Sequence, residues 1–221
     1  RVSNTCPKIF ESFGAAEFNA RLMTVALTGT DGKADLPLPP NVRRYYFPGT
    51  THGGDDKGGF VHAPVALNAC VMARNPVPEK GQLAALAQAL VDWVARGVEP
   101  PASSYPRLAA GELAPNTAQA MGWPAIPNAP KPDGMAIGLM EYDYGPELKA
   151  NDFAGVLVQW PPAIHQTIAA LMPKLDADGN EKAGLPAVQH QVPLGTYTGW
   201  NVTKAGFFQG PEGEARRAKL L

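Results

Sequence analysis

The sequence predicts an α/β fold with long irregular connections, and three observations support this prediction. A segment that alternates in the manner of a strand, 7–13, runs into a helical pattern that begins at Gly14. A second segment, 42–47, is rich in strand-forming residues. A long amphipathic helical pattern follows over Lys80–Arg96. Strand, helix and strand in this order indicate part of a parallel sheet with helices packed on it.

Turn-forming residues separate these segments. Residues 30–33 have the composition of a turn, 36–40 form a proline-rich connector, and Pro48 and Gly49 end the second strand. Gly97 is placed to end the long helix. Six residues at three- and four-residue spacing are predicted to form the buried face of that helix: Leu83, Leu86, Ala87, Leu90, Val91 and Val94.

The second half of the chain is predicted to be richer in loops, since the sequence contains 23 glycines and 23 prolines. We expect 100–130 to form a loop wrapped over the core, and 138–144 and 184–200 to be extended. The chain then divides into residues 1–100, which form the sheet core, and residues 101–221, a proline-rich and loop-rich extension that packs on it.

Composition favours a small-molecule partner. The chain of 221 residues is 45% hydrophobic and 18% charged, which is typical of a globular protein. Nineteen basic and twenty acidic residues leave a net charge of −1, so there is no electrostatic signature for nucleic acid or an anionic membrane. No apolar run of about eighteen residues, as a membrane span needs, occurs in the sequence. We therefore expect neither a nucleic acid nor a membrane partner.

The two cysteines leave the cellular compartment open. Cys6 and Cys70 are an even pair that can form one disulfide in a secreted or periplasmic protein. Two buried thiols in a cytoplasmic protein are the alternative.

Each predicted strand is followed by a polar residue that suits acid–base chemistry. Glu17 follows the first strand and His52 follows the second, within Thr50-Thr51-His52-Gly53-Gly54. Their separation is 52 − 17 = 35 residues, one strand–helix–strand unit. In the hydrolase layout the triad runs serine, then acid, then histidine, so this order fits. A carboxylate that accepts one ring N–H stabilises an imidazole that takes a serine proton.

Several sequence blocks in one order resemble a known family, the bacterial proteins described as alpha/beta hydrolase domain-containing. The blocks extend along nearly the whole chain, which makes the resemblance more specific than any single motif. They are residues 6–10, 15–18, 41–53, 74–76, 92–106, 123–127, 176–186 and 193–201.

The resemblance implies the C-terminal portion of an alpha/beta-hydrolase fold and a serine-type hydrolase of carboxylic esters that needs no cofactor. It implies His52 as the general base and Glu17 as the triad acid. The nucleophile elbow G-x-S-x-G is missing, and neither Ser103 nor Ser104 lies at a predicted strand-to-helix turn. We therefore expect the nucleophile in an N-terminal segment or companion chain, and no activity from this chain alone.

Other interpretations of the same residues remain open. Glu11 competes with Glu17 as the acid, because a glutamate that opens a helix can simply complement the helix dipole. A non-catalytic binding module on a hydrolase scaffold is a different-class alternative. A metal-dependent hydrolase is another, with the ligand cluster His52, Asp55, Asp56 and His62, although the spacing matches no known zinc signature.

Three further features have ordinary structural explanations. Residues 176–181 are similar to a calcium loop, but the glycine falls at the wrong position, so a polar turn is favoured. His165 and His190 have no discernible partners, and we expect structural roles for them. Five aromatic residues could line a substrate pocket or pack in the core: Tyr142, Tyr144, Trp160, Tyr197 and Trp200.

Overall fold

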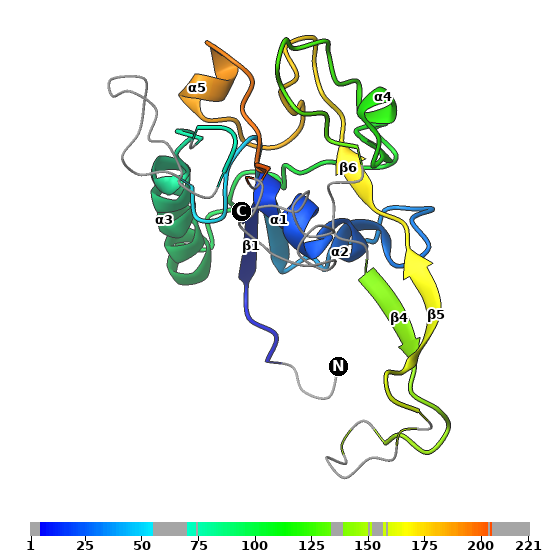
Figure 1. Ribbon diagram of the computed structural model, residues 1–221. Coiled ribbons are helices and arrows are strands. Elements are labelled where there is room, and N and C mark those ends of the chain that lie inside the picture. The colour runs from blue at the N-terminus through cyan, green and yellow to red at the C-terminus, as the bar shows by residue number, and fades with distance from the viewer. Residues whose placement is uncertain are drawn as a thin grey trace.

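The structure is a computed structural model that describes residues 5–54, 70–73, 75–133, 139–149, 151, 157, 159–202 and 204. Figure 1 shows how its helices and strands are arranged. In chain order they are β1 (Ile9–Gly14), α1 (Ala15–Arg21), α2 (Thr24–Thr28), β2 (Val42–Phe47), α3 (Lys80–Arg96), β3 (Leu113–Pro115), α4 (Ala118–Met121), β4 (Leu139–Asp143), β5 (Ala163–Ile168), β6 (Leu171–Pro173) and α5 (Val188–Gln191).

The central element is a parallel pair of strands. β1 and β2 run in the same direction, with Ile9 opposite Val42 and Gly14 opposite Phe47. The strand-forming aromatic and β-branched residues of both segments fit this pairing, so the two predicted strands are confirmed. On the far edge of β2, Ser104 N–H donates to Arg44 O at 2.9 Å and extends the sheet by a single bridge.

The two strands are covered on both faces. Figure 1 shows α3 on one side of β1, and α1 and α2 on the other. Successive side chains of a strand point to opposite faces, so neighbouring aromatics of β2 enter different layers. Tyr45 and Phe47 pack against Leu86 of α3. Tyr46 packs against Phe13 and Phe18 in the larger cluster that surrounds α1.

The buried face of α3 differs from the predicted one. The helix has the predicted bounds and ends at Gly97, which adopts the left-handed conformation. Its buried residues are Leu86 and Trp93, whereas Val91 and Val94 are more than half exposed. The Trp93 ring lies 5.9 Å from the Phe10 ring, and this large contact turns the helix so that a narrower stripe faces the sheet.

The second half contains more regular structure than predicted. Within 100–130, β3 pairs antiparallel with β6, and Thr117 caps the short helix α4 by accepting a hydrogen bond from Ala120 N–H. The segment 184–200 is not a strand, because α5 interrupts it between Pro186 and Pro193. Among the described residues the fold is therefore mixed α/β with three small two-stranded sheets.

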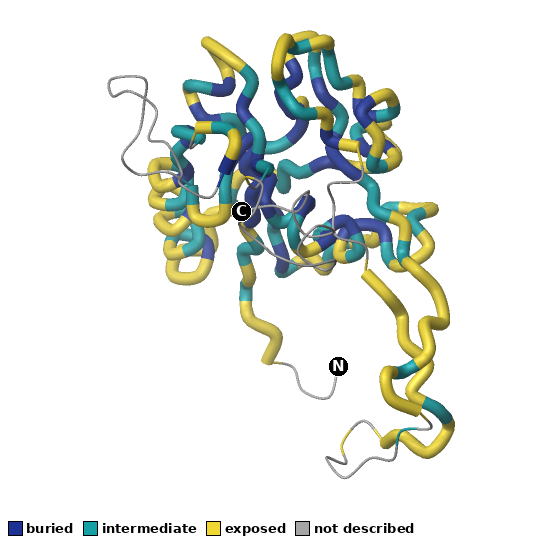
Figure 2. The backbone as a smooth tube through the Cα atoms, viewed as in Figure 1, coloured by how far each residue is buried: buried dark blue, intermediate teal, exposed yellow. Residues whose placement is uncertain are grey.

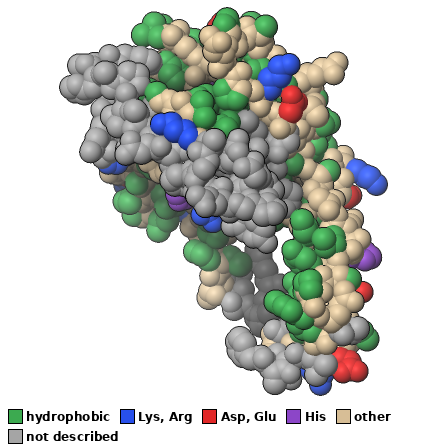
Figure 3. Space-filling model, in the orientation of Figure 1, with side chains coloured by type: hydrophobic (Ala, Val, Ile, Leu, Met, Phe, Trp, Pro, Cys, Tyr) green, Lys and Arg blue, Asp and Glu red, His purple; other side chains and the backbone are tan. Residues whose placement is uncertain are grey.

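The predicted strand at 138–144 is confirmed as β4, which forms an antiparallel hairpin with β5. Figure 2 shows the hairpin exposed along most of its length, and Figure 3 shows hydrophobic side chains gathered over it. Tyr142, Tyr144 and Trp160 lie in this region and are exposed, Trp160 at 83%. These three aromatics therefore line no pocket in the core. Tyr197 and Trp200 are buried, as core residues are.

Both cysteines are free thiols. Cys6 is exposed near the start of the chain and Cys70 is 2% exposed, so they are not bridged and the disulfide interpretation is wrong. Burial raises the pKa of the Cys70 thiol. No described helix combines the length and apolar character that crossing a bilayer requires.

A buried polar network connects the two halves of the chain. The Tyr46 hydroxyl and the Gly49 N–H donate to the carboxylate of Glu181, at 2.5 Å and 2.7 Å. His190 Nε2 lies 2.7 Å from the Glu181 carbonyl oxygen. Burial raises the pKa of Glu181 to about 7, although the two donated hydrogen bonds lower it. Burial and the neighbouring Glu181 raise the pKa of Tyr46.

The raised pKa of Glu181 predicts that the free energy of unfolding depends on pH. Its pKa is raised in the folded chain from the ordinary value of 4.5, so the folded state binds the extra proton. The free energy of unfolding should fall by roughly 3 kcal/mol as the pH rises from about 4.5 to about 7, and then level off. Urea unfolding across this range should show a flatter profile for Glu181→Gln. The control Glu99→Gln removes an exposed carboxylate and should keep the wild-type slope; equal slopes for all three proteins would contradict the prediction.

Candidate active site

The parallel pairing of β1 and β2 brings the loops that follow them to one end of the sheet. Because Gly14 lies opposite Phe47, the segments that follow the two strands leave from the same edge. Ala16 N–H donates to Thr50 O at 3.2 Å and ties the start of α1 to the loop after β2. Glu17 and His52 therefore meet, although 35 residues separate them.

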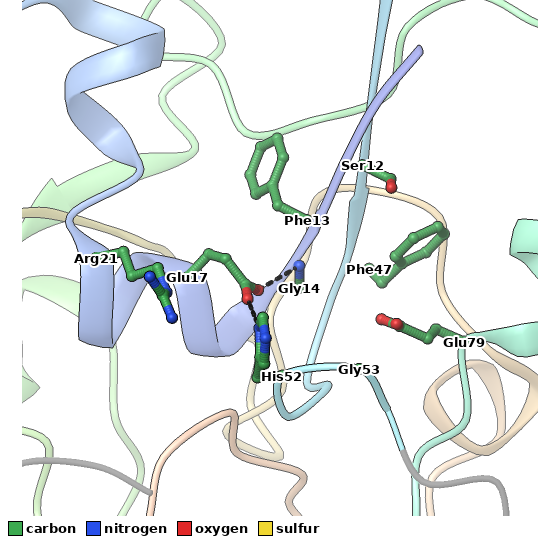
Figure 4. Close-up of a pocket in the computed structure, with 9 residues that line it drawn as sticks. All are labelled: Ser12, Phe13, Gly14, Glu17, Arg21, Phe47, His52, Gly53 and Glu79. Atoms are coloured by element: carbon green, nitrogen blue, oxygen red, sulfur yellow. Dashed lines mark hydrogen bonds and ion pairs between the residues drawn. The ribbon is translucent and has the colours of Figure 1, made fainter.

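Glu17 is held from two directions (Figure 4). Its Oε2 accepts a hydrogen bond from Gly14 N–H at 2.8 Å, and its Oε1 is hydrogen-bonded to His52 Nδ1. The Glu17 side chain is only 15% exposed, whereas that of His52 is 75% exposed. The carboxylate is thus fixed in the protein, and the imidazole is oriented by it. Among the described residues, none forms a hydrogen bond with Nε2 of His52.

A tight turn carries His52. Gly54 N–H donates to Thr51 O at 3.0 Å, and Gly54 has φ +64°, in the left-handed region that favours glycine. A Cβ at Gly54 would lie 2.9 Å from Glu79 N and 2.7 Å from Glu79 Cγ. The turn therefore packs directly on the start of α3, and only glycine fits there.

The Glu17–His52 pair faces a pocket of about 480 Å³, within the size range of small-molecule sites. Its lining residues are Ser12, Phe13, Gly14, Glu17, Arg21, Phe47, His52, Gly53 and Glu79. Of these nine residues, only Glu17 and His52 were predicted from the sequence as site residues, and Ser12, Arg21, Phe47 and Glu79 add polar and aromatic groups to them. Ser12 and Phe47 belong to the two predicted strands, so their alternation could have placed them near the site. No local signal connects Glu79 with Glu17, because α3 and α1 are far apart in the sequence.

Glu79 is the second carboxyl group of the pocket. It is 9% exposed and precedes the first turn of α3. Burial, together with the nearby Glu17, raises the pKa of Glu79, although the nearby His52 lowers it. The pocket therefore contains two carboxyl groups in different environments: one bound to an imidazole and a backbone N–H, the other buried.

Structural contacts account for Glu11, Ser103 and Ser104. Glu11 forms an ion pair with Arg44 Nε at 2.6 Å, away from His52. Ser103 Oγ accepts a hydrogen bond from Arg44 N–H, and Ser104 Oγ donates to Gly184 O. Neither serine lies at a strand-to-helix turn, as the sequence predicted. His165 lies exposed on β5, outside the pocket.

The structure does not describe most of the candidate metal ligands. Asp55, Asp56 and His62 lie outside the described residues, and no group of three potential ligands occurs within the described part. The segment that is similar to a calcium loop is a polar turn: Asp176 Oδ1 accepts hydrogen bonds from Asp178 N–H and Asn180 N–H, both at 2.9 Å. The prediction of a turn is confirmed.

The packing of Gly54 on Glu79 can be tested with two alanine variants. Gly53→Ala adds a side chain at φ +81° with no atom of the described residues within 4 Å, so among them it introduces backbone strain alone. Gly54→Ala adds similar strain and a clash with the Glu79 backbone. Left-handed strain costs about 1–3 kcal/mol, and we expect a clearly larger loss of unfolding free energy for Gly54→Ala. Equal losses in urea unfolding would show that the contact is absent.

Comparison with known proteins assigns the chain to a family. The alpha/beta hydrolase domain family matches residues 2–220, which is nearly the whole chain. The searches of curated proteins and of solved structures gave no match. The resemblance inferred from the sequence blocks is confirmed. The chain therefore belongs to the alpha/beta hydrolase domain family, which indicates that it is a hydrolase.

Proposed function

We propose that the chain supplies the acid and the general base of a serine-type hydrolase that acts on carboxylic esters. The observation that supports this most strongly is the hydrogen bond between Glu17 Oε1 and His52 Nδ1 at the common end of two parallel strands. A carboxylate, an oriented imidazole and a pocket lie together there. Acid and histidine also follow neighbouring strands in the chain order of this superfamily.

The chemistry follows from the orientation of the imidazole. With Nδ1–H donated to Glu17, the neutral ring presents a bare Nε2, which takes the proton of a serine hydroxyl as the serine attacks the ester carbonyl. Glu17 stabilises the imidazolium that forms. His52 then returns the proton to the departing alcohol, and an acyl-enzyme remains. Water that is activated by the same Nε2 releases the carboxylic acid.

The nucleophile is proposed to come from an N-terminal segment or companion chain outside the 221 residues. Ser3, Ser12, Ser103 and Ser104 are the serines of the sequence, and none lies in a G-x-S-x-G motif. Ser12 lines the pocket but lies inside β1, and no hydrogen bond joins it to His52. Within the described residues β1 pairs only with β2, and a further strand on its other edge is part of this proposal.

Fluorophosphonate labelling tests this assignment. An adduct is expected on a polypeptide that co-purifies with this chain or is joined to its N-terminus, because the reagent reacts with an activated serine. His52→Ala should abolish labelling, whereas the matched control His165→Ala, on exposed β5, should retain it. Intact mass identifies the labelled chain. An adduct on Ser12, or labelling that survives His52→Ala, would contradict the assignment, and no labelling of any component would favour a binding module.

The identity of the acid is tested with two glutamine variants in the preparation that labels. Glu17→Gln keeps the shape of the side chain but cannot stabilise the imidazolium, and a drop in turnover of roughly 10³- to 10⁴-fold is expected with p-nitrophenyl acetate. Glu11→Gln removes the carboxylate that pairs with Arg44 and should leave turnover within about twofold. The opposite result would make Glu11 the acid.

A further inference from the structure

Glu79 lines the pocket at the start of α3. It precedes α3, where a carboxylate complements the helix dipole, and it makes no side-chain capping hydrogen bond. Among the described residues, none donates a hydrogen bond to its carboxyl group and none forms an ion pair with it. Nine-tenths of the residue is nevertheless buried. Its carboxyl oxygens are not among the enclosed polar atoms that lack a partner, so they face the open pocket, where a ligand can reach them.

The carboxyl group is aimed into the pocket. Figure 4 shows it pointing inward from the opposite side to Arg21, toward the space in front of the Glu17–His52 pair. The Gly54 turn packs against Glu79 Cγ and its backbone, which fixes the side chain relative to the His52 loop. His52 and Glu79 line the same pocket, so a substrate that binds beside Nε2 of His52 shares that pocket with the Glu79 carboxyl group.

We propose that Glu79 is a specificity-determining residue that binds a hydroxyl group carried by the ester substrate. This proposal rests on the proposed function, because it assumes that the ester lies beside His52. The charged and titratable groups that line the pocket with Glu79 are Glu17 and Arg21 of α1 and His52 of the loop after β2.

A hydroxyl group fits this environment better than an ammonium group. An ammonium beside His52 would oppose formation of the imidazolium on which the proton transfer depends, whereas a hydroxyl is neutral. Burial and Glu17 raise the pKa of Glu79, which favours the neutral carboxyl form. A hydroxyl can donate to the ionised carboxylate or accept from the neutral acid. An ammonium group can only donate hydrogen bonds, so it needs the Glu79 carboxyl group in its ionised form.

The test measures binding, which needs no nucleophile. The imidazole signals of His52 in the 221-residue chain are followed by NMR during titration with matched esters. The probes are methyl 2-hydroxybutanoate, methyl 3-hydroxybutanoate and 2-hydroxyethyl butanoate, each paired with its methoxy counterpart, and methyl 3-aminobutanoate as the ammonium probe. At least one hydroxy ester should bind roughly 10- to 100-fold more tightly than its methoxy partner. The ammonium ester should bind less tightly than that hydroxy ester.

Two variants assign the effect to the carboxyl group. Glu79→Met keeps the carbon chain that packs on Gly54 and should reduce the discrimination to less than twofold. Glu79→Gln keeps a hydrogen-bonding group and should retain most of it. The proposal is overturned if no pair is discriminated by the wild type, if discrimination survives Glu79→Met, or if the ammonium ester binds best. Failure of the labelling experiment would remove the proposed function but would leave these affinities unchanged, so the two failures are distinguishable.

Discussion

The in-register parallel pairing of β1 with β2 is the constraint on which the rest of the structure depends. Parallel strands end at the same edge, so the segments after Gly14 and Phe47 must begin side by side. The sheet is stabilised by helices on both faces, and aromatic side chains fill both layers. The hydrogen bond from Ala16 N–H to Thr50 O then fixes α1 against the neighbouring loop. Glu17 and His52 lie side by side because this backbone hydrogen bond joins the two segments that carry them.

Residues of the second half of the chain hold the turn that precedes His52 in place. The Glu181 carboxylate accepts the Gly49 N–H, three residues before His52, and it is held by the Tyr46 hydroxyl from β2 itself. Asn75 binds the Gly49 carbonyl oxygen and also that of Thr198. Segments far apart in the sequence therefore converge on the short turn between β2 and His52. The position of the imidazole is set by this packing as well as by Glu17.

Local patterns predicted the parts of the site that depend on local structure. Alternation and strand propensity identified β1 and β2, and the order of Glu17 and His52 then implied that they meet. The buried face of α3 was misjudged because a heptad-like pattern cannot reveal that Trp93 packs on Phe10. Glu79 and Glu181 could not be found, since their contacts with the site span segments that no short-range pattern connects. Glu181, for example, lies 132 residues from Gly49.

The tautomer of His52 tests the central claim most directly. Two-bond ¹H–¹⁵N NMR spectra of the 221-residue chain distinguish Nδ1–H from Nε2–H imidazole. Because Glu17 accepts the hydrogen bond at Nδ1, the neutral ring should be the Nδ1–H tautomer, and Glu17→Gln should abolish this preference while Glu11→Gln preserves it. An Nε2–H tautomer in the wild type, or a spectrum that Glu17→Gln leaves unchanged, would contradict the pairing of Glu17 with His52.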